Sequence, residues 1–273
     1  MENTGRYNWP IYDELGTFKG TVYVIPPLHL KKSMGLVRGK TDKIDAIRIA
    51  LFIEKNFQLL PVWQPLSSAI KQLKVLLAER NIRIKQKKQT QTKQSDYRLL
   101  KDTELAKSLL KLNQQLADAL TEQITVLEQK IATLIKSDIQ LNKQAQLMRT
   151  VPGVGKVLCW ALLASTEGFK KINAPRKLAC YSGVVPFEHQ SGTSVRGKTR
   201  VSQYADKKLK SLLHLAAMSA IRLKNELKTY YQRKVAEGKS KMSVLNAVRN
   251  KIIHRVFAVI RNEKPYLEHL FLS

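Results

Sequence analysis

The sequence predicts an α+β protein that is mostly α-helical and is organised in three consecutive regions. Residues 1–60 mix short helical and β-rich segments, residues 66–145 carry two long runs of apolar residues at helical spacing, and residues 146–273 are mostly helical with one loop-rich interruption. A chain of 273 residues is long enough for two domains, or for one domain with a large helical element. We take the three regions as the predicted domains.

The first region combines one predicted strand with one amphipathic helix. Residues 11–18 are weakly helical, and residues 21–25 form a β-rich run that two consecutive prolines terminate. A helix is then expected to begin near Thr41. Its apolar face, at helical spacing, consists of Ala46, Ile49, Ala50 and Ile53.

The second region predicts two long helices. Apolar residues recur at helical steps from Ile70 to Ile84 and again from Leu105 to Leu134. The Gln- and Lys-rich residues 85–94 between them have no apolar face, so a turn and an exposed extension both remain open. Together the two helices predict an antiparallel hairpin or coiled coil. Consecutive four-residue steps near Leu120 interrupt the heptads, so the pattern does not predict how many helices associate in a coiled coil.

The charge balance predicts a polyanionic partner. The chain has 48 Lys and Arg against 21 Asp and Glu, a formal net charge of +27. The basic residues are spread along the whole chain and no run of about eighteen apolar residues occurs, which favours nucleic acid over a membrane. Residues 1–10 lack the pattern of a signal peptide, and the two cysteines form no spacing motif. We expect a cytoplasmic, nucleoid-associated protein without a membrane partner.

Residues 147–156, LMRTVPGVGK, carry the most specific local motif. An apolar helix end, a Pro-Gly-Val-Gly turn and a new helix over residues 157–164 are typical of a helix-hairpin-helix. Gly153 and Gly155 let such a turn approach a phosphate, the following helix offers free N–H groups, and Lys156 adds positive charge. An ordinary turn between helices is the alternative interpretation. The basic composition favours phosphate contact.

Two further patterns are compatible with chemistry. Asp42 and Asp45 lie three residues apart, so on a helix both carboxylates point to one side and could hold Mg²⁺. Capping of the helix start is the alternative. A serine before a glycine occurs in the loop-rich residues 181–194, followed by the cations Arg196, Lys198 and Arg200, which could hold a phosphate beside the hydroxyl. A polar surface loop is the alternative.

The order and spacing of these segments resemble the insertion-sequence one-ten family of DEDD transposases. The resemblance covers essentially the whole chain. It is carried by residues 1–7 (MENTGRY), 24–27 (VIPP), 38–46 (RGKTDKIDA), 152–155 (PGVG), 183–186 (GVVP) and 190–192 (QSG). It implies a RuvC-like (RNase H-like) α/β catalytic domain within residues 1–60, a long coiled coil over 66–145, and a helical transposase domain with the helix-hairpin-helix over 146–273.

The resemblance also implies site residues and partners. Glu2, Asp42 and Asp45 correspond to the second, third and fourth acids of a four-acid set that binds Mg²⁺, and Ser191 corresponds to the serine that attacks DNA. Ser194 is a weaker candidate for that role. In the family the serine comes from another protomer and a structured bridge RNA selects the DNA. The resemblance therefore implies a homo-oligomer (a dimer or a tetramer) that binds insertion-sequence ends, target DNA and a guide RNA.

One departure from the family pattern concerns the catalytic acids. The first Asp of the set lies on an opening strand that would precede Met1, so only three of the four carboxylates are present. We expect from this an N-terminally truncated chain with weakened metal binding and poor recombinase activity. The alternatives are a nucleic-acid-binding remnant without catalysis and a coiled-coil adaptor.

Overall fold

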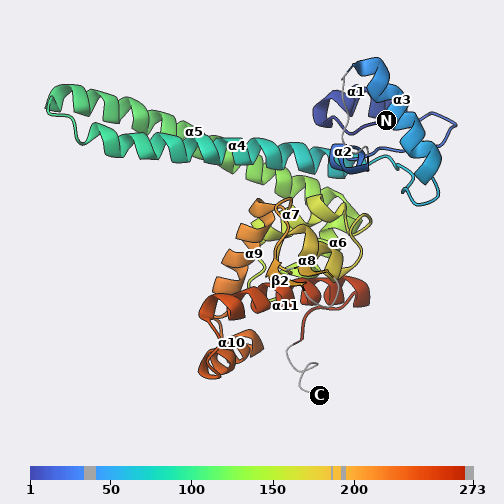
Figure 1. Ribbon diagram of the computed structural model, residues 1–273. Helices are drawn as coiled ribbons and strands as arrows, with labels where there is room; N and C mark the ends of the chain where they lie inside the picture. The colour runs from blue at the N-terminus through green and yellow to red at the C-terminus, as the bar shows by residue number, and fades with distance from the viewer. Residues whose placement is uncertain (34–40, 186, 192–194, 268–273) are drawn as a thin grey trace. The chain divides into compact units, whose positions relative to one another are not determined.

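The computed structural model describes residues 1–33, 41–185, 187–191 and 195–267, with the strand residues among 187–200 described by their backbone (Figure 1). The chain divides into two compact units, Met1–Ser67 and Ser68–Ser273, each of which is described by itself. The described chain as a whole is mostly helical, as predicted. Among the described residues, none of the helices combines the length and the apolar content that crossing a bilayer requires.

The first unit consists of short helices and a single β-bridge. Its elements are the 3₁₀ helix η1 (Gly5–Asn8), α1 (Trp9–Glu14), α2 (Pro27–Ser33) and α3 (Asp42–Asn56). The strand predicted at residues 21–25 is wrong, because only Ile25 bridges, in parallel, to Glu2. The Ile25 N–H donates to the Met1 carbonyl and the Ile25 carbonyl accepts from Asn3 N–H, each at 2.9 Å. Pro26 has no N–H and cannot continue the pairing.

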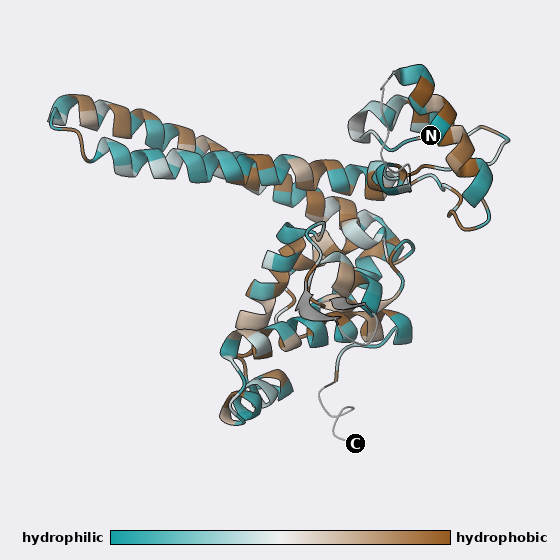
Figure 2. Cartoon of the chain, viewed as in Figure 1, coloured by the Kyte–Doolittle hydropathy of each residue, from teal (hydrophilic) through white to brown (hydrophobic). Residues whose placement is uncertain are grey.

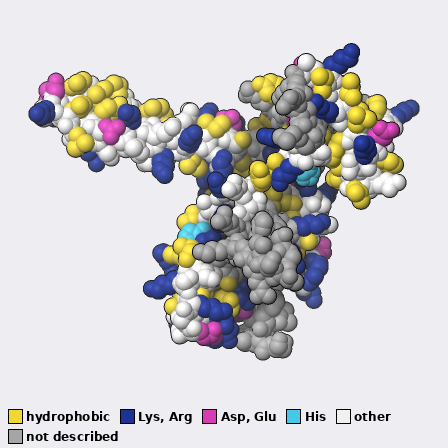
Figure 3. Space-filling model, viewed as in Figure 1, with side chains coloured by type: hydrophobic (Ala, Val, Ile, Leu, Met, Phe, Trp, Pro, Cys, Tyr) yellow, Lys and Arg dark blue, Asp and Glu magenta, His cyan; other side chains and the backbone are white. Residues whose placement is uncertain are grey.

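The core of the first unit is small. Ile25 and Leu30 are its buried apolar side chains among the described residues, and Tyr12 stacks on Trp63 with ring centroids 5.3 Å apart. Helix α3 begins where the sequence predicts, with the Thr41 hydroxyl accepting from Ile44 N–H. None of its residues is buried, and the space-filling view shows apolar side chains on the surface of this unit (Figure 3). The apolar stripe on α3 is therefore only partly covered, with Ile49 and Ile53 half-buried and Ala46 and Ala50 exposed.

The second unit begins with an antiparallel helical hairpin. Helix α4 (Ser68–Tyr97) includes the Gln- and Lys-rich residues 85–94, so this segment extends the helix, and the turn lies at 98–102. Helix α5 (Thr103–Ser137) returns along α4, capped by the Asp102 carboxylate (Figure 1). Arg83 donates to Gln123 at 2.8 Å and Gln94 donates to Gln114 at 3.0 Å. The residue number of the partner on α5 thus decreases as the residue number on α4 increases. This order defines an antiparallel pair.

One polar cluster ties the hairpin to the rest of the unit. Arg80 Nη2 on α4 lies 2.6 Å from Glu128 Oε1 on α5, and Lys156 Nζ at the start of α7 lies 2.6 Å from the other Glu128 oxygen. Apolar residues recur along α5, whereas polar residues dominate the outer part of α4 (Figure 2). The side chains between the two helices include buried Leu73, Leu120 and Ile131. The hairpin thus has an apolar seam with a charged pair near its base.

Helices form most of the remainder of the second unit. Their order is α6 (Ile139–Arg149), α7 (Lys156–Thr166), α8 (Pro175–Tyr181), β1 (Phe187–Ser191), β2 (Val195–Arg200), α9 (Lys207–Ala220), α10 (Glu226–Ala236) and α11 (Lys241–Asn262). Helix α11 contacts α6, α8, α9 and α10, and its residues Val248, Ile252 and Val256 are fully buried. Their spacing of four residues places them on one face, around which the other helices assemble.

The Arg80–Glu128 pair should contribute to stability because both side chains are largely buried. Replacing Arg80 with Ala removes two hydrogen bonds to a carboxylate, and we expect the free energy of unfolding to fall by about 1–3 kcal/mol. The control is Lys107→Ala, which breaks the exposed pair with Glu104 and should change it by less than about 0.5 kcal/mol. Unfolding in urea, which is uncharged and does not screen ion pairs, measures the free energy of unfolding of both variants. Equal losses in the two variants would contradict this role.

Glu128 should also make stability depend on pH. Burial raises the pKa of its carboxyl, but hydrogen bonds from Lys156 and Arg80 outweigh burial and hold the pKa below its ordinary value of 4.5. A lowered pKa in the folded state stabilises the protein above the ordinary value, and this contribution is lost as pH falls through the folded-state pKa. The stability difference between the parent protein and Glu128→Gln should therefore shrink from pH 6 to pH 3. A constant difference across urea titrations at these pH values would argue against the pair.

Candidate functional site

The three predicted carboxylate ligands all lie in the first unit. Glu2 forms the β-bridge with Ile25, and its carbonyl accepts a hydrogen bond from the Asn8 side chain at 2.8 Å. Asp42 and Asp45 occupy the first turn of α3, where their negative charges also interact favourably with the positive end of the helix dipole. Asp45 lies 3.4 Å from Arg48 one turn later. Thr41 already caps α3, and acidic residues in the first turn stabilise a helix. Stabilisation of the helix start therefore explains part of the reason that Asp42 and Asp45 occur here.

The fit of these residues to Mg²⁺ is partial. Two carboxylates on one helical turn suit a small hard cation that keeps several waters. Within the described parts of the chain, however, no group of three or more His, Cys, Asp or Glu side chains is placed to hold a metal ion. Glu2 is therefore not gathered with Asp42 and Asp45, and the three-ligand site stays a prediction.

The predicted serine lies in a β-hairpin, whereas the sequence predicts a loop there. Ser191 is the last residue of β1 and pairs in antiparallel register with Val195, the first residue of β2. Arg196, Lys198 and Arg200 occupy alternate positions of β2, and Arg196 pairs with Gln190. Ser194 lies outside the described residues. The backbone pairing brings the serine and the start of the basic strand into one short element.

The root of this hairpin is held by three contacts. Gly183 has φ +64°, and a Cβ there would lie 2.6 Å from the Cβ of Ala205, so the chain before β1 and the chain after β2 pass close together. Asp206 N–H donates to the Tyr181 carbonyl at 2.9 Å. Asn246 on α11 donates its side-chain amide to the Val184 carbonyl at 2.7 Å. The hairpin therefore starts from a fixed base on α8, α9 and α11.

The Pro-Gly-Val-Gly turn joins α6 to α7, as predicted. Gly153 has φ +86°, and a Cβ there would lie 2.3 Å from the Ala216 carbonyl oxygen of α9. This glycine is thus required for packing against α9 and for the left-handed backbone. Gly155 is the N-cap of α7 with no side-chain cap, and a Cβ there would meet open space. Lys156 is paired with Glu128 and lies 5.8 Å from the centre of the Trp160 ring.

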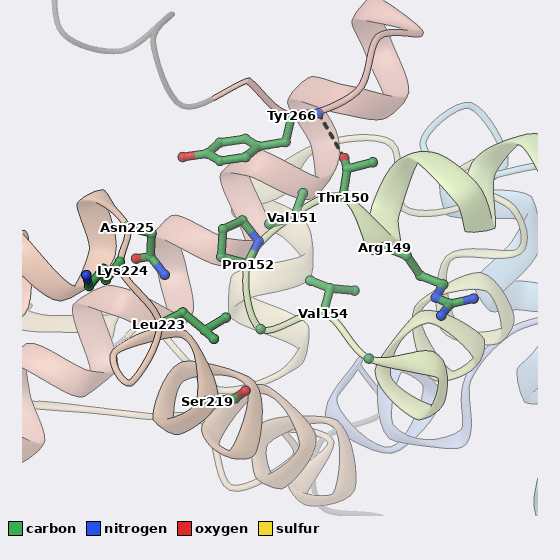
Figure 4. A pocket seen from close by; sticks show the side chains of 12 residues that line it. Arg149, Thr150, Val151, Pro152, Val154, Ser219, Leu223, Lys224, Asn225 and Tyr266 are labelled. Atoms are coloured by element: carbon green, nitrogen blue, oxygen red, sulfur yellow. Dashed lines mark hydrogen bonds between the residues drawn. The ribbon is translucent and has the colours of Figure 1, made fainter.

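A cavity of about 580 Å³ opens beside this turn (Figure 4). Residues 149–155 form one wall, and the opposite wall comes from the end of α9 and the loop that follows it. Figure 4 shows Ser219 and Leu223 across from Pro152, with Lys224 and Asn225 farther along. Tyr266 closes one side, and its backbone N–H donates to the Thr150 hydroxyl at 2.8 Å. No acidic side chain is among the described residues that line the cavity.

Several of these lining residues were not predicted. Arg149 lies in the motif but is not among its predicted phosphate contacts, and Lys224 and Tyr266 are more than 60 residues distant from the turn in sequence. Burial and a hydrogen bond to Glu226 raise the pKa of Tyr266 to about 12. The phenol therefore stays protonated, and Tyr266 acts as a hydrogen-bond donor to the Glu226 carboxylate. No local sequence signal marks these residues, because the tertiary fold alone brings them to the turn.

Two family models match separate parts of the chain. A model described as "Transposase IS116/IS110/IS902 family" matches residues 145–232, which include the turn, the serine hairpin and α9. A second model, described as "Transposase" and built for DEDD transposases, matches residues 1–103, which include Glu2, Asp42 and Asp45. The two matches together include the first unit and parts of the second.

Similar proteins span nearly the whole chain. The pilin gene-inverting proteins of Moraxella bovis and Moraxella lacunata are each 30% identical to it over 275 aligned positions, which cover 97% of this chain and 80% of the relative. The IS900 insertion-element 42 kDa protein of Mycobacterium paratuberculosis is 26% identical over 151 positions, 54% of this chain and 38% of that protein. Two of these relatives are thus named for gene inversion.

Gly153 should be far less tolerant of a side chain than Gly155. Gly153→Ala forces a Cβ into the Ala216 carbonyl and strains a left-handed backbone, which by itself costs about 1–2 kcal/mol. Gly155→Ala meets open space and should lower the free energy of unfolding by less than about 1 kcal/mol. Urea unfolding of the two variants is the measurement. A smaller loss for Gly153→Ala than for Gly155→Ala would contradict the close approach of the turn to α9.

Proposed function

This chain belongs to the IS116/IS110/IS902 family of transposases, and from that premise we propose that it cuts and rejoins DNA strands with Ser191 as the nucleophile. The observation that carries the proposal is the 30% identity to pilin gene-inverting proteins over 97% of the chain. Inverting a gene requires that strands be cut and joined to new partners. The serine motif supports the choice of nucleophile, since Ser191 ends a strand beside the basic strand β2.

The proposed step is a transesterification. The Ser191 hydroxyl oxygen attacks a DNA phosphorus, a P–O bond to a deoxyribose breaks, and a phosphoserine ester forms. The serine proton passes to a base or to water, and the departing deoxyribose oxygen takes up a proton. One phosphoester replaces another, so a hydroxyl of a new strand can reverse the step and reseal the DNA. Cations from the basic strand would stabilise the charge on the phosphate.

A divalent cation is proposed to assist this chemistry. Asp42 and Asp45 supply two oxygen ligands on one turn of α3, and the family match over residues 1–103 supports Glu2 as a third. When bound, Mg²⁺ would polarise the phosphate and stabilise the charge on the attacking or leaving oxygen. The acids of the first unit and the serine of the second would then serve one site, which in this proposal is completed by another copy of the chain.

Nucleic acids are the proposed partners. The net charge of +27 supports binding to DNA, and Lys and Arg side chains are distributed over the face of the second unit seen in Figure 3. The turn at 152–155 is proposed to contact a phosphate as a helix-hairpin-helix, because its cavity has basic and no acidic lining among the described residues. A structured guide RNA that selects the DNA is part of the same proposal and rests on the family resemblance.

A covalent adduct tests the nucleophile. The full-length protein is incubated with Mg²⁺, guide RNA and labelled DNA that carries the ends of its element, and denaturing gels detect protein attached to DNA. With three carboxylates to bind Mg²⁺, we expect a low yield of adduct with the parent protein and with Ser194→Ala, and none with Ser191→Ala. An adduct that persists in Ser191→Ala would reject this serine. Salt-sensitive DNA binding without any adduct in the parent protein would indicate a nucleic-acid-binding protein without catalysis.

A further inference from the structure

We propose that His214 on α9, with the side chain of Arg249 buried behind it, forms a binding site for a phosphate of the DNA backbone. The site is separate from the predicted turn contacts and uses residues that no sequence motif marks. The inference rests on the proposed function in one respect, because DNA is taken as the source of the phosphate.

Arg249 is a buried cation that lacks a carboxylate partner among the described residues. Its residue surface is 6% exposed, and its Nε has no hydrogen-bond partner in the part of the chain that the structure describes. Nη1 donates to the Asn246 side chain at 3.2 Å and Nη2 to His214 Nδ1 at 2.7 Å. Burial lowers the pKa of this guanidinium, but arginine remains charged in proteins. An unpaired buried charge is costly, so an external anion would offset part of the penalty.

The contact with Arg249 determines which nitrogen of His214 carries the proton. A guanidinium has five N–H donors and no acceptor, so Nδ1 of His214 must accept the hydrogen bond. The ring proton then lies on Nε2, which becomes an N–H donor. Because Arg249 faces the other side of the ring, its positive charge strengthens the attraction of this donor for an anion.

His214 lies at a second cavity, of about 560 Å³, along α9. Its lining also includes Ser219 and Arg222, together with Leu215, Met218 and Leu223, and its surface is mostly apolar. Three residues that carry hydrogen-bond donors thus border this mostly apolar cavity. A phosphodiester backbone presents the matching features, since each charged phosphate is flanked by sugars with apolar faces. No acidic residue lines this cavity within the described part of the chain.

The second cavity adjoins the cavity at the turn. Both are lined by Ser219 and Leu223, which Figure 4 shows on the α9 side of the turn. The cations Arg149 and Lys224 border the first cavity, and Arg222 borders the second. A strand that contacts the turn can therefore continue along α9 to His214. The complementarity is that of a positive groove to a polyanion, which commits the site to a nucleic-acid backbone.

The same buried network reaches the serine hairpin. Asn246 accepts from Arg249 and donates to the Val184 carbonyl at 2.7 Å, three residues before the start of β1. One chain of hydrogen bonds thus runs from His214 through Arg249 and Asn246 to the root of the hairpin that ends at Ser191. A phosphate bound at His214 would interact with a network that also holds the base of the proposed nucleophile.

Binding of a labelled DNA duplex, measured by fluorescence anisotropy across a range of salt concentrations, tests the site in the full-length protein. Removing one hydrogen bond to a charged group in His214→Ala should weaken DNA binding about ten-fold. His214→Gln keeps an N–H donor near Nε2 and should stay within about three-fold of the parent. Arg222→Ala should lower the slope of log K against log salt by about 0.9, the value for one lost phosphate contact.

Matched controls separate the site from a general loss of charge or fold. His254 and Arg261 are exposed on α11 and do not line either cavity, so His254→Ala and Arg261→Ala should bind DNA as the parent does. Thermal melting of every variant verifies that it is folded at the temperature of the measurement. If His214→Ala is unfolded there, the Arg222→Ala result decides, because Arg222 is exposed and its replacement should leave the fold intact.

The possible outcomes are distinct. Equal affinities for His214→Ala and His254→Ala, with salt-sensitive DNA binding in the parent, would reject the site and leave the proposed function intact. If His214→Ala lost affinity for a single-stranded RNA probe but bound duplex DNA as the parent does, DNA would be rejected as the source of the phosphate. A parent protein that binds no DNA at moderate salt would reject the proposed function and, with it, this site.

Discussion

The close approach of Gly153 to the Ala216 carbonyl is the constraint on which the second unit depends. It sets the turn between α6 and α7 against α9, so that residues 149–155 and the end of α9 become two walls of one cavity. A Cβ at this position would lie 2.3 Å from that oxygen, so any side chain would push the walls apart. The glycine that the motif associates with phosphate contact is thus first required for packing, and the cavity is a consequence of that packing.

Charge is organised differently in the two halves of the second unit. At the base of the helical hairpin, Glu128 pairs with Arg80 of α4 and with Lys156 of α7, and the cluster stabilises the fold. Around α9, the cations Arg149, Arg222 and Lys224 border cavities without an acidic lining residue in the described chain, and Arg249 is buried near them. Paired cations hold helices together, whereas cations without acidic neighbours create a positive potential that can attract a polyanion. The second arrangement is the one that the proposed function uses.

Sequence patterns predicted the elements that depend on local spacing. The start of α3, the two long helices α4 and α5, and the turn after Arg149 all lie where apolar periodicity and capping residues indicate. The predicted strand at 21–25 was wrong, since pairing beyond Ile25 requires a partner strand. The serine segment, expected as a loop, is a hairpin, because its pairing depends on register across a turn and its polar residues show no alternation. The roles of Glu2, Asp42, Asp45 and Ser191 remain predictions.

The sequence by itself determined the mostly helical class, the polyanion partner class and the family, because periodicity, net charge and motif order are properties of the linear chain. Only the tertiary structure decided that Gly153 packs on α9, that Lys156 is paired with Glu128, and that His214 and Arg249 meet. His214 and Arg249 are 35 residues apart and lie on different helices. Their contact follows from how α9 packs on α11, and no local pattern encodes a packing angle between helices.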